Sequence, residues 1–430
     1  MDLPARFPPS RRPGRLVPGF FLGLAFLALS GCASFSPKPA ETSTFHQRAR
    51  SRESGPFRVT VAVLSDEESR EVFGVPLADK GAQPVWVSIE NRGETHAWFF
   101  PITVDAEYFA PLEAAYPHHS WFSEKVNRRM DRYFEENQIG YYIPPGGRQS
   151  GFVYARRRLG VRYVNVELFG EKKELARFGF TVPVPGGSLD YLRVDFETLY
   201  PPGSFASYDL KTLRQALDNL ACCTTNASGD RPGDPVNLVV VGKEEDVLSA
   251  FVRRGWRLAE TLSVESSEKT ASSFLFGSRY MNAPVSPLHL FGRKQDIALQ
   301  KARDDIDQRN HLRLWLAPFR FEGESVWVGQ ISRDIGVRFT LKTPILTTHK
   351  IDPDVDEARD YLLQDMLFSN SIRRFGYARG VGAAGPGAAR ENLTGDPYST
   401  DGKRLVVFVS GESVPFERVI ILDWELPTLR

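Results

Sequence analysis

The chain has 430 residues, of which 42% are hydrophobic, 12% aromatic and 25% charged. This composition is typical of packed globular domains and excludes a disordered or coiled-coil chain. The formal net charge of +1 gives no basis for a nucleic-acid partner, and the length is sufficient for two domains with separate cores.

The N-terminus has the pattern of a bacterial lipoprotein signal peptide. An apolar run of 14 residues, 16–29, follows a basic stretch and ends in the lipobox Leu29-Ser30-Gly31-Cys32. As a helix this run would cover only about 21 Å of a hydrocarbon core about 30 Å thick, which disfavours a retained transmembrane anchor. The basic stretch is supplied by four arginines, Arg6, Arg11, Arg12 and Arg15.

We therefore expect residues 1–31 to be removed and Cys32 to carry a diacylglycerol on its thiol and a palmitate-type acyl chain on its new amino group. Each buried methylene contributes about 0.8 kcal/mol, so these chains are sufficient for stable anchoring. Ala33 follows the cysteine where an acidic retention signal would otherwise stand. The sequence thus predicts a membrane-anchored lipoprotein on the periplasmic side, at the outer membrane.

Residues 32–56 are polar and lack apolar periodicity, so we expect a flexible tether. From 57 to 187, short apolar runs with period-two alternation are separated by Gly and Pro, which predicts an antiparallel β-sandwich of the immunoglobulin-like kind. The expected strands are 57–63, 84–93, 98–104, 151–155, 162–169 and 177–184.

An amphipathic helix is predicted over 120–137, within this β pattern. Its apolar face includes Phe122, Val126 and Met130, and its opposite face is basic. The basic face is either solvated or in contact with anionic lipids, which attract such side chains at about 1 kcal/mol per charge. Its members are Lys125, Arg128, Arg129 and Arg132.

Residues 205–425 mix helical and strand patterns without a strict βαβ repeat, which predicts an α+β domain with a mixed sheet. Helices are expected at 210–221, 244–254 and 297–306. The expected strands are 236–241, 274–281, 311–316, 325–331 and 405–409.

Beyond Cys32 the only cysteines are the adjacent Cys222 and Cys223, so a disulfide framework is excluded. Neighbouring cysteines close only a strained eight-membered ring. We expect two structural thiols at a helix end, with a vicinal disulfide or redox pair and a metal site as open alternatives.

His349 and three aspartates form the densest group of potential metal ligands. Asp352 followed by Pro353 also fits the N-cap and first residue of a helix, where nearby acids favour the positive dipole end. An EF-hand is excluded because Glu357 and Leu363 stand where Gly and Glu are needed. The capped helix is the favoured interpretation, and no metal or cofactor is predicted. The remaining acids of the group are Asp354 and Asp356.

A glycine pattern at 380–385 fits a dinucleotide-binding loop by its letters alone. Pro386-Gly387 follows where the helix should run, so we expect an ordinary loop.

The region from about 210 to 410 resembles the LssY-like C-terminal domain family. The similarity is carried by blocks that include Gly255-Trp256 and Trp327-Val328-Gly329. The family has no assigned activity, and its members often follow membrane segments, so the resemblance implies a membrane context. An acid-phosphatase module is absent, since Phe339 stands where its histidine would lie. The other blocks are 233–242, 280–288, 291–301, 310–315, 332–336 and 349–356.

Charged residues directly follow apolar stretches in this region, where pockets commonly form. They either line a pocket for a carboxylate or phosphate or make ion pairs that fix the fold. His289 and His311 are expected to be packing or capping residues. The candidate pocket consists of Arg293, Asp296, Arg333, Asp334, His349 and Asp352.

The favoured function is that of a non-catalytic binding or accessory lipoprotein of the cell envelope, with the membrane and an envelope protein or anionic ligand as partners. The alternative is a hydrolase that acts on phosphate-containing or lipid envelope substrates through this pocket. Convergence of its six side chains would favour the enzyme.

Overall fold

The computed structural model describes residues 35–158, 161–171, 175–184, 194–196, 198–201, 203–259, 286–302, 309–339 and 347–427. For residues 161, 337–339 and 347–349, only the backbone is described. The leader, Cys32 and the strand expected at 274–281 lie outside these ranges. No helix within them has the length and apolar character needed to cross a bilayer.

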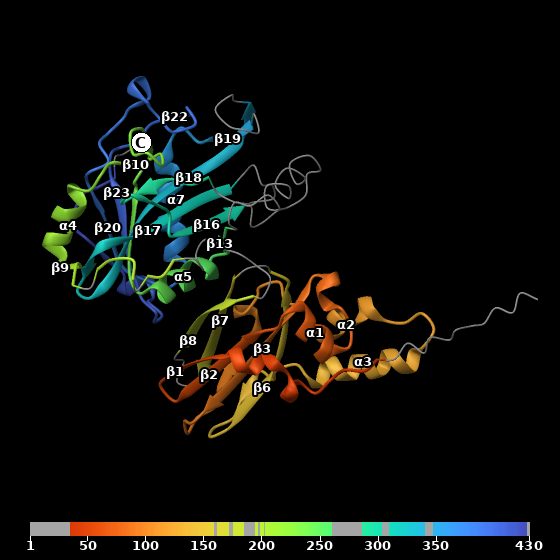
Figure 1. The fold of residues 1–430 in the computed structure, drawn as a ribbon. Helices are drawn as coiled ribbons and strands as arrows, with labels where there is room; N and C mark the ends of the chain where they lie inside the picture. Colours follow the sequence, from red (N-terminus) through yellow and green to blue (C-terminus); the bar gives the residue numbers. More distant parts are fainter. Residues whose placement is uncertain are drawn as a thin grey trace, which may run out of the picture. The chain divides into compact units, whose positions relative to one another are not determined.

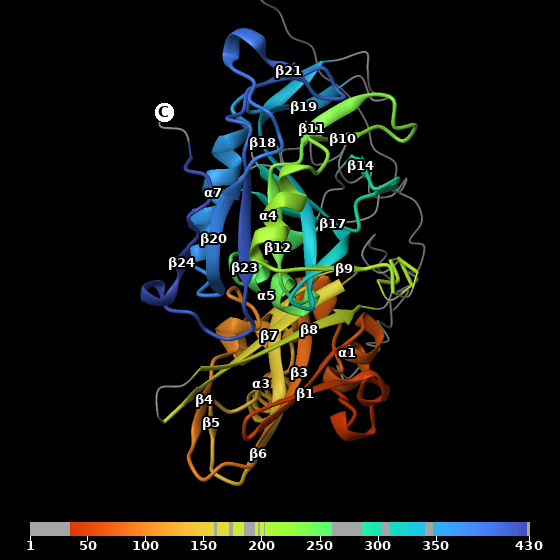
Figure 2. The ribbon, with the colours of Figure 1, turned by 90° about the vertical axis from the view of Figure 1, so that its left-hand side faces the viewer.

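The first part of the chain forms two four-stranded antiparallel sheets (Figures 1 and 2). The first sheet has the strand order β1-β2-β3-β6 and consists of β1 (Arg50–Ser54), β2 (Phe57–Val63), β3 (Ala82–Asn91) and β6 (Arg148–Arg156). The second has the order β5-β4-β7-β8 and consists of β4 (Ala97–Phe99), β5 (Tyr142–Ile143), β7 (Val161–Gly170) and β8 (Leu175–Pro183).

Both sheets contribute to one hydrophobic core. Alternate residues of β2, such as Val59 and Val61, share it with Val166 of β7 and Phe180 of β8. Side chains two apart on a strand point to the same face, so the alternation in the sequence selects this buried face. The expected antiparallel β architecture is confirmed, whereas an immunoglobulin-like strand order is not.

Helices cover the outer face of the first sheet. Trp86 of β3 and Phe152 of β6 pack there against Phe73 and Phe134. Strand β3 is therefore buried on both faces along almost its whole length. The helical segments of this part are α1 (Asp66–Phe73), η3 (Leu77–Lys80), η4 (Pro101–Thr103), α2 (Pro111–Ala115), η5 (Tyr116–His118) and α3 (Glu124–Glu136).

Most of the segment expected to be a tether, 32–56, is folded onto this layer. It contains η1 (Ala40–Thr42), η2 (Thr44–Arg48) and strand β1. Phe45 is fully buried, with its ring centroid 5.8 Å from that of Trp86. A few single aromatic anchors hold the segment, and single anchors leave no periodic pattern in a polar sequence. The expectation of a flexible tether is thus wrong from Phe35 onward.

Helix α3 begins later than predicted. Ser123 is its N-cap, and the Ser123 hydroxyl accepts a hydrogen bond from the backbone N–H of Val126. Phe122 therefore precedes the helix and is exposed, although the periodicity assigned it to the buried face.

The second part contains a large mixed sheet with the order β13-β16-β17-β18-β12-β23-β20-β24, in which β19 pairs with β18 and β9 with β17. Strands β12 and β23 are parallel, while β17 and β18 are antiparallel. The predicted mixed sheet is confirmed. Its strands are β9 (Ala206–Tyr208), β12 (Leu238–Val241), β13 (Arg257–Leu258), β16 (Ile297–Ala302), β17 (Arg309–Phe321), β18 (Glu324–Phe339), β19 (Thr347–Ile351), β20 (Ile372–Ala378), β23 (Arg404–Val409) and β24 (Ile420–Ile421).

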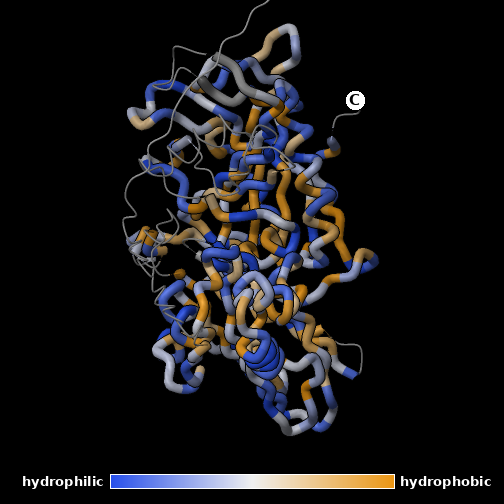
Figure 3. Tube along the Cα trace, turned by 90° about the vertical axis from the view of Figure 1, so that its right-hand side faces the viewer, coloured by the Kyte–Doolittle hydropathy of each residue, from blue (hydrophilic) through white to orange (hydrophobic). Residues whose placement is uncertain are grey.

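Two helical layers cover the sheet. Helices α5 (Glu244–Arg253) and α7 (Val355–Leu367) pack on one face through residues such as Phe251 and Leu362. Helix α4 (Leu210–Asp218) packs on the other through Leu213 and Leu217. Hydrophobic residues accordingly concentrate along the strands of the sheet (Figure 3).

The segment expected as a helix at 297–306 is strand β16 over its described residues. Ile297 and Leu299 face the α5 and α7 core, while Ala298 and Gln300 are buried on the other face. A strand buried on both faces shows no alternation of polarity, which is why its pattern was misread.

Short elements complete this part. Strands β10 (Cys223–Thr225), β11 (Pro232–Pro235), β14 (His289–Leu290) and β15 (Arg293–Lys294) form one small sheet, and β21 (Arg390–Glu391) pairs with β22 (Pro397–Tyr398). The 3-10 turns are η7 (Pro386–Ala388), which follows the glycine pattern at 380–385, and η8 (Phe416–Arg418).

Candidate functional site: a buried polar cluster on the mixed sheet

One end of the α4 face of the sheet is polar. Along β17, Trp315 and Ala317 belong to the apolar core under α4, and the period of two places Arg309, His311 and Arg313 on the same face. On β18, Val328 is followed on this face by Gln330, Ser332 and Asp334. We call these residues the polar cluster; its members, each at most 7% exposed, are Gln300, Arg309, His311, Arg313, Gln330, Ser332 and Asp334.

A histidine and a carboxylate lie at its centre. The imidazole Nε2 of His311 is in close hydrogen-bond contact with the Asp334 carboxylate. The guanidinium Nε of Arg309 lies 3.4 Å from the same carboxylate oxygen. Ser332 stands directly opposite His311 in the antiparallel register, so the two side chains share a face.

Arg313 forms the second part of the cluster. Its Nη1 donates to the side-chain oxygen of Gln330 over 2.6 Å, and its Nε and Nη2 donate to the Ser286 carbonyl over 3.1 and 2.9 Å. The nearby carboxyl of Asp234, on β11, is buried and lowers the cost of this buried guanidinium electrostatically.

Burial shifts the titration of these groups. Desolvation, assisted by the charges of Arg309 and Arg313, holds the pKa of His311 well below its usual range, although the Asp334 carboxylate acts in the opposite direction. Burial also lowers the pKa of Arg313 to about 10 and raises the pKa of Asp234. His311 is therefore neutral at pH 7.

This arrangement suits anion binding and proton transfer. Buried guanidinium groups hold phosphate or carboxylate oxygens through directed hydrogen bonds. A neutral imidazole fixed by a carboxylate is able to accept a proton as a general base. Among the described residues, no group of three or more His, Cys, Asp or Glu side chains is placed to hold a metal ion.

Two of the predicted pocket residues pair with each other elsewhere. Nε and Nη2 of Arg293 donate to the two carboxylate oxygens of Asp296 over 2.9 and 2.8 Å. Arg293 also donates to the Tyr200 hydroxyl, and Asp296 accepts from the backbone N–H of Leu316. These contacts fix the β15 to β16 turn, as the ion-pair interpretation expects.

Arg333 and Asp334 point to opposite faces because they are consecutive in β18. Asp334 belongs to the polar cluster. Arg333 donates to the Asn310 side chain over 3.1 Å and lies 5.3 Å from the ring centroid of Tyr361 on α7.

The aspartates near His349 organise the start of α7. The N-cap is Asp354, whose carboxylate accepts from the N–H of Asp356, while Asp352 accepts from the N–H of Asp354 over 3.0 Å. The helix thus starts two residues later than predicted, with Asp354 in place of Asp352 as its cap. His349 lies in β19 opposite Val337, and it is one of the residues of which only the backbone is described.

Of the five predicted pocket residues whose side chains the structure describes, only Asp334 is found in the polar cluster. Arg309, Arg313, Gln300 and Gln330 were not predicted, and His311 was expected to pack or cap. The available signal was the alternation Arg309, His311, Arg313 at the start of a strand whose next residues, 314–317, are all apolar.

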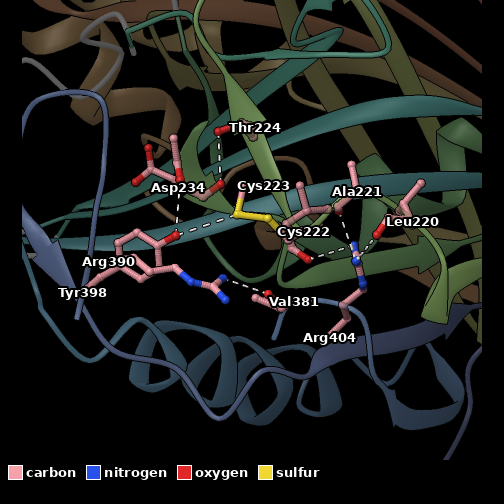
Figure 4. The surroundings of a disulfide bond; sticks show 12 residues. Leu220, Ala221, Cys222, Cys223, Thr224, Asp234, Val381, Arg390, Tyr398 and Arg404 are labelled. Atoms are coloured by element: carbon pink, nitrogen blue, oxygen red, sulfur yellow. Dashed lines mark hydrogen bonds between the residues drawn. A yellow bond between two sulfur atoms is a disulfide. The ribbon is translucent and has the colours of Figure 1, made fainter. Parts of the chain in front are cut away.

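The two neighbouring cysteines are joined in a disulfide, so the expectation of two structural thiols is wrong (Figure 4). Cys222 lies between α4 and β10, and Cys223 is the first residue of β10. The Cys223 Sγ is 3.8 Å from the Tyr398 hydroxyl. The buried Arg404 guanidinium donates to the carbonyls of Leu220 and Ala221 over 2.7 and 3.1 Å. These hydrogen bonds fix the backbone of the two residues that precede the disulfide.

The layers and the polar cluster define an α+β domain built around a mixed sheet with a buried charged face. Residues 213–403 match the model of the family described as LssY C-terminus. This region is therefore an LssY-like C-terminal domain, as the sequence blocks predicted, and it contains the complete polar cluster. A comparison with curated proteins found no match.

Proposed function

We propose that the protein is a lipid-anchored lipoprotein of the bacterial cell envelope whose LssY-like domain binds an anionic ligand without catalysis. The observation that carries this proposal is the polar cluster. Seven buried polar side chains lie together on the sheet face whose core under α4 is apolar, and burying charge in this way costs free energy unless the site is used or fully paired.

The guanidinium groups of the cluster suit an anionic ligand. Arg309 and Arg313 are countered by Asp334 and by Asp234, whose pKa is raised. A phosphate or carboxylate group would add negative charge beside both guanidinium groups and reduce the electrostatic cost of their burial.

Stabilisation by inorganic phosphate tests the binding proposal. A ligand that binds only the folded state stabilises it by RT ln(1 + L/Kd), where L is the free ligand concentration, so the melting temperature rises with that concentration. We expect phosphate to raise the melting temperature of wild type and to have little effect on Arg313→Gln. Arg320→Gln is the matched control, because Arg320 lies on the same strand but donates to Gly323 and Ser325 at its far end. Equal shifts in all three proteins would contradict the proposal.

The anchor rests on the lipobox pattern before Cys32, with the membrane as partner and the periplasmic side of the outer membrane as the location. We expect wild type to incorporate a palmitate analogue and to sediment with membranes. Cys32→Ser should lose both properties while its melting temperature stays unchanged. A Cys32→Ser protein that remains in the membrane fraction would overturn this assignment.

The second candidate is a hydrolase that acts on phosphate-containing or lipid envelope substrates. It is favoured by the contact between His311 and Asp334, because Ser332 stands opposite His311 on the neighbouring strand. A histidine that is oriented by a carboxylate and lies near a hydroxyl is the arrangement that activates a serine nucleophile. Hydrolysis of p-nitrophenyl phosphate or a p-nitrophenyl ester, lost in His311→Gln, would favour this function over pure binding.

For the N-terminal sheets, the finer assignment that we propose is an immunoglobulin-like sandwich. Its support is the shared core between two four-stranded antiparallel sheets.

A further inference from the structure

Two adjacent aromatic side chains project from the loop before α3. Trp121 is 96% exposed and Phe122 is 98% exposed, the highest values among the large hydrophobic residues that the structure describes. Exposing both rings to water is unfavourable, so a pair at this position indicates a contact surface.

The loop backbone is held to the helix. The Asn127 side chain accepts from the N–H of Ser120 over 2.8 Å and donates to the Ser120 carbonyl over 2.9 Å. The Ser120 hydroxyl accepts from the N–H of Phe122. The aromatic pair is thus presented by a fixed turn.

A basic stripe lies beside it on α3. Its members are spaced three and four residues apart and therefore share one helix face. The carboxylates of the helix balance its charge overall, but Asp131 bonds His119 over 2.7 Å, and Glu135 and Glu136 lie at the end of the helix away from the loop. The stripe consists of Lys125, Arg128, Arg129 and Arg132, of which Arg128 also contacts Glu124.

The first residue that the structure describes, Phe35, packs against the same helix, α3. The ring centroid of Phe35 lies 5.7 Å from that of Tyr133, and the Arg129 guanidinium lies 5.9 Å from the Phe35 centroid. Cys32 precedes Phe35 by three residues, a length of chain that reaches at most about 11 Å. A lipid on Cys32 would therefore bring the bilayer surface close to α3.

We propose that the basic stripe and the loop before α3 form a membrane-contacting surface. Trp121 and Phe122 enter the interfacial region of the bilayer, where aromatic rings are favoured, and the basic stripe contacts anionic headgroups. This inference rests on the proposed lipid anchor and adds a defined orientation of the protein on its membrane.

Quenching of tryptophan emission by brominated phospholipids tests this surface. The full chain is purified from membranes, checked for lipid on Cys32 by mass spectrometry, and reconstituted into phosphatidylethanolamine and phosphatidylglycerol vesicles that contain the brominated lipid. We expect quenching of wild type to drop at least twofold in Trp121→Phe, because phenylalanine keeps the apolar contact and removes the reporter. Trp98→Phe is the control, since Trp98 is 44% exposed on β4 and should leave the quenching unchanged.

The outcomes separate the two proposals. If Cys32 carries no lipid and the protein does not associate with the vesicles, the proposed anchor itself is overturned. Lipidated protein that reconstitutes but shows the same quenching in wild type and Trp121→Phe would overturn the contact surface and leave the anchor intact. Because Trp121 is exposed, its replacement should not affect folding, which unchanged melting curves verify.

Discussion

Individual charged residues in the LssY-like domain are buried in groups whose members depend on one another. Arg359, fully buried on α7, contacts the carboxylates of Asp356, Asp360 and Asp401. Hydrogen bonds from this guanidinium, with its charge, outweigh burial and lower the pKa of Asp401 to about 2. Asp401 lies 42 residues from Arg359 in the sequence, so this pairing had no local signal.

Asp401 should make folding depend on pH in acid. Its pKa is lower in the folded protein than the ordinary value near 3.8, so its stabilising contribution is present above about pH 4 and is lost as the pH falls through about 2. We expect the difference in free energy of unfolding between wild type and Asp401→Asn to shrink from pH 5 to pH 2.5. Urea unfolding at the two pH values measures it, and a constant difference would contradict the assignment.

The disulfide gives a chemical prediction at the same scale. Since Cys222 and Cys223 are bonded to each other, neither should react with iodoacetamide in denaturant without a reductant, and both should react after reduction. Mass spectrometry of the peptide that contains them counts the added groups. Cys222→Ser supplies the control, because its remaining Cys223 thiol should be alkylated without reduction.

Elements whose polarity alternates were predicted well, and elements buried on both faces were not. Strand β2 has the expected bounds of 57–63. The pattern of β16 predicts a helix although the segment is a strand, because its first four residues are all buried and show no alternation of polarity. The ends of helices depend on single capping hydrogen bonds, which explains the displaced starts of α3 and α7. The polar cluster escaped notice because its residues become neighbours only when β16, β17 and β18 pair.

The cap of α7 can be tested directly. Asp354 accepts from the N–H of Asp356, whereas Asp352 lies outside the helix. Replacing an N-cap aspartate by alanine costs about 1 kcal/mol. We expect Asp354→Ala to lose about this much free energy of unfolding in urea and Asp352→Ala to lose less. The reverse order would place the helix start at the earlier residue.

Across the whole molecule, composition and periodicity predicted the β-rich first part and the mixed sheet of the second. The sequence blocks led to the LssY-like family, which the match over 213–403 confirms. The function follows from none of these alone, because a fold carries many functions and the site decides between them. Here the site is the polar cluster, and its proposed ligand is an anion.

The most direct test of this account follows the imidazole nitrogens of His311 by NMR in ¹⁵N-histidine-labelled protein, with His311→Gln identifying the signal. The burial of His311 predicts a neutral ring at pH 7. Inorganic phosphate should shift its resonances and raise its pKa, because added negative charge favours the protonated ring. If phosphate moves the resonances of His311 no more than those of His96, a histidine of the β-sheet part whose side chain is 32% exposed, the polar cluster does not bind this anion and the central proposal is contradicted.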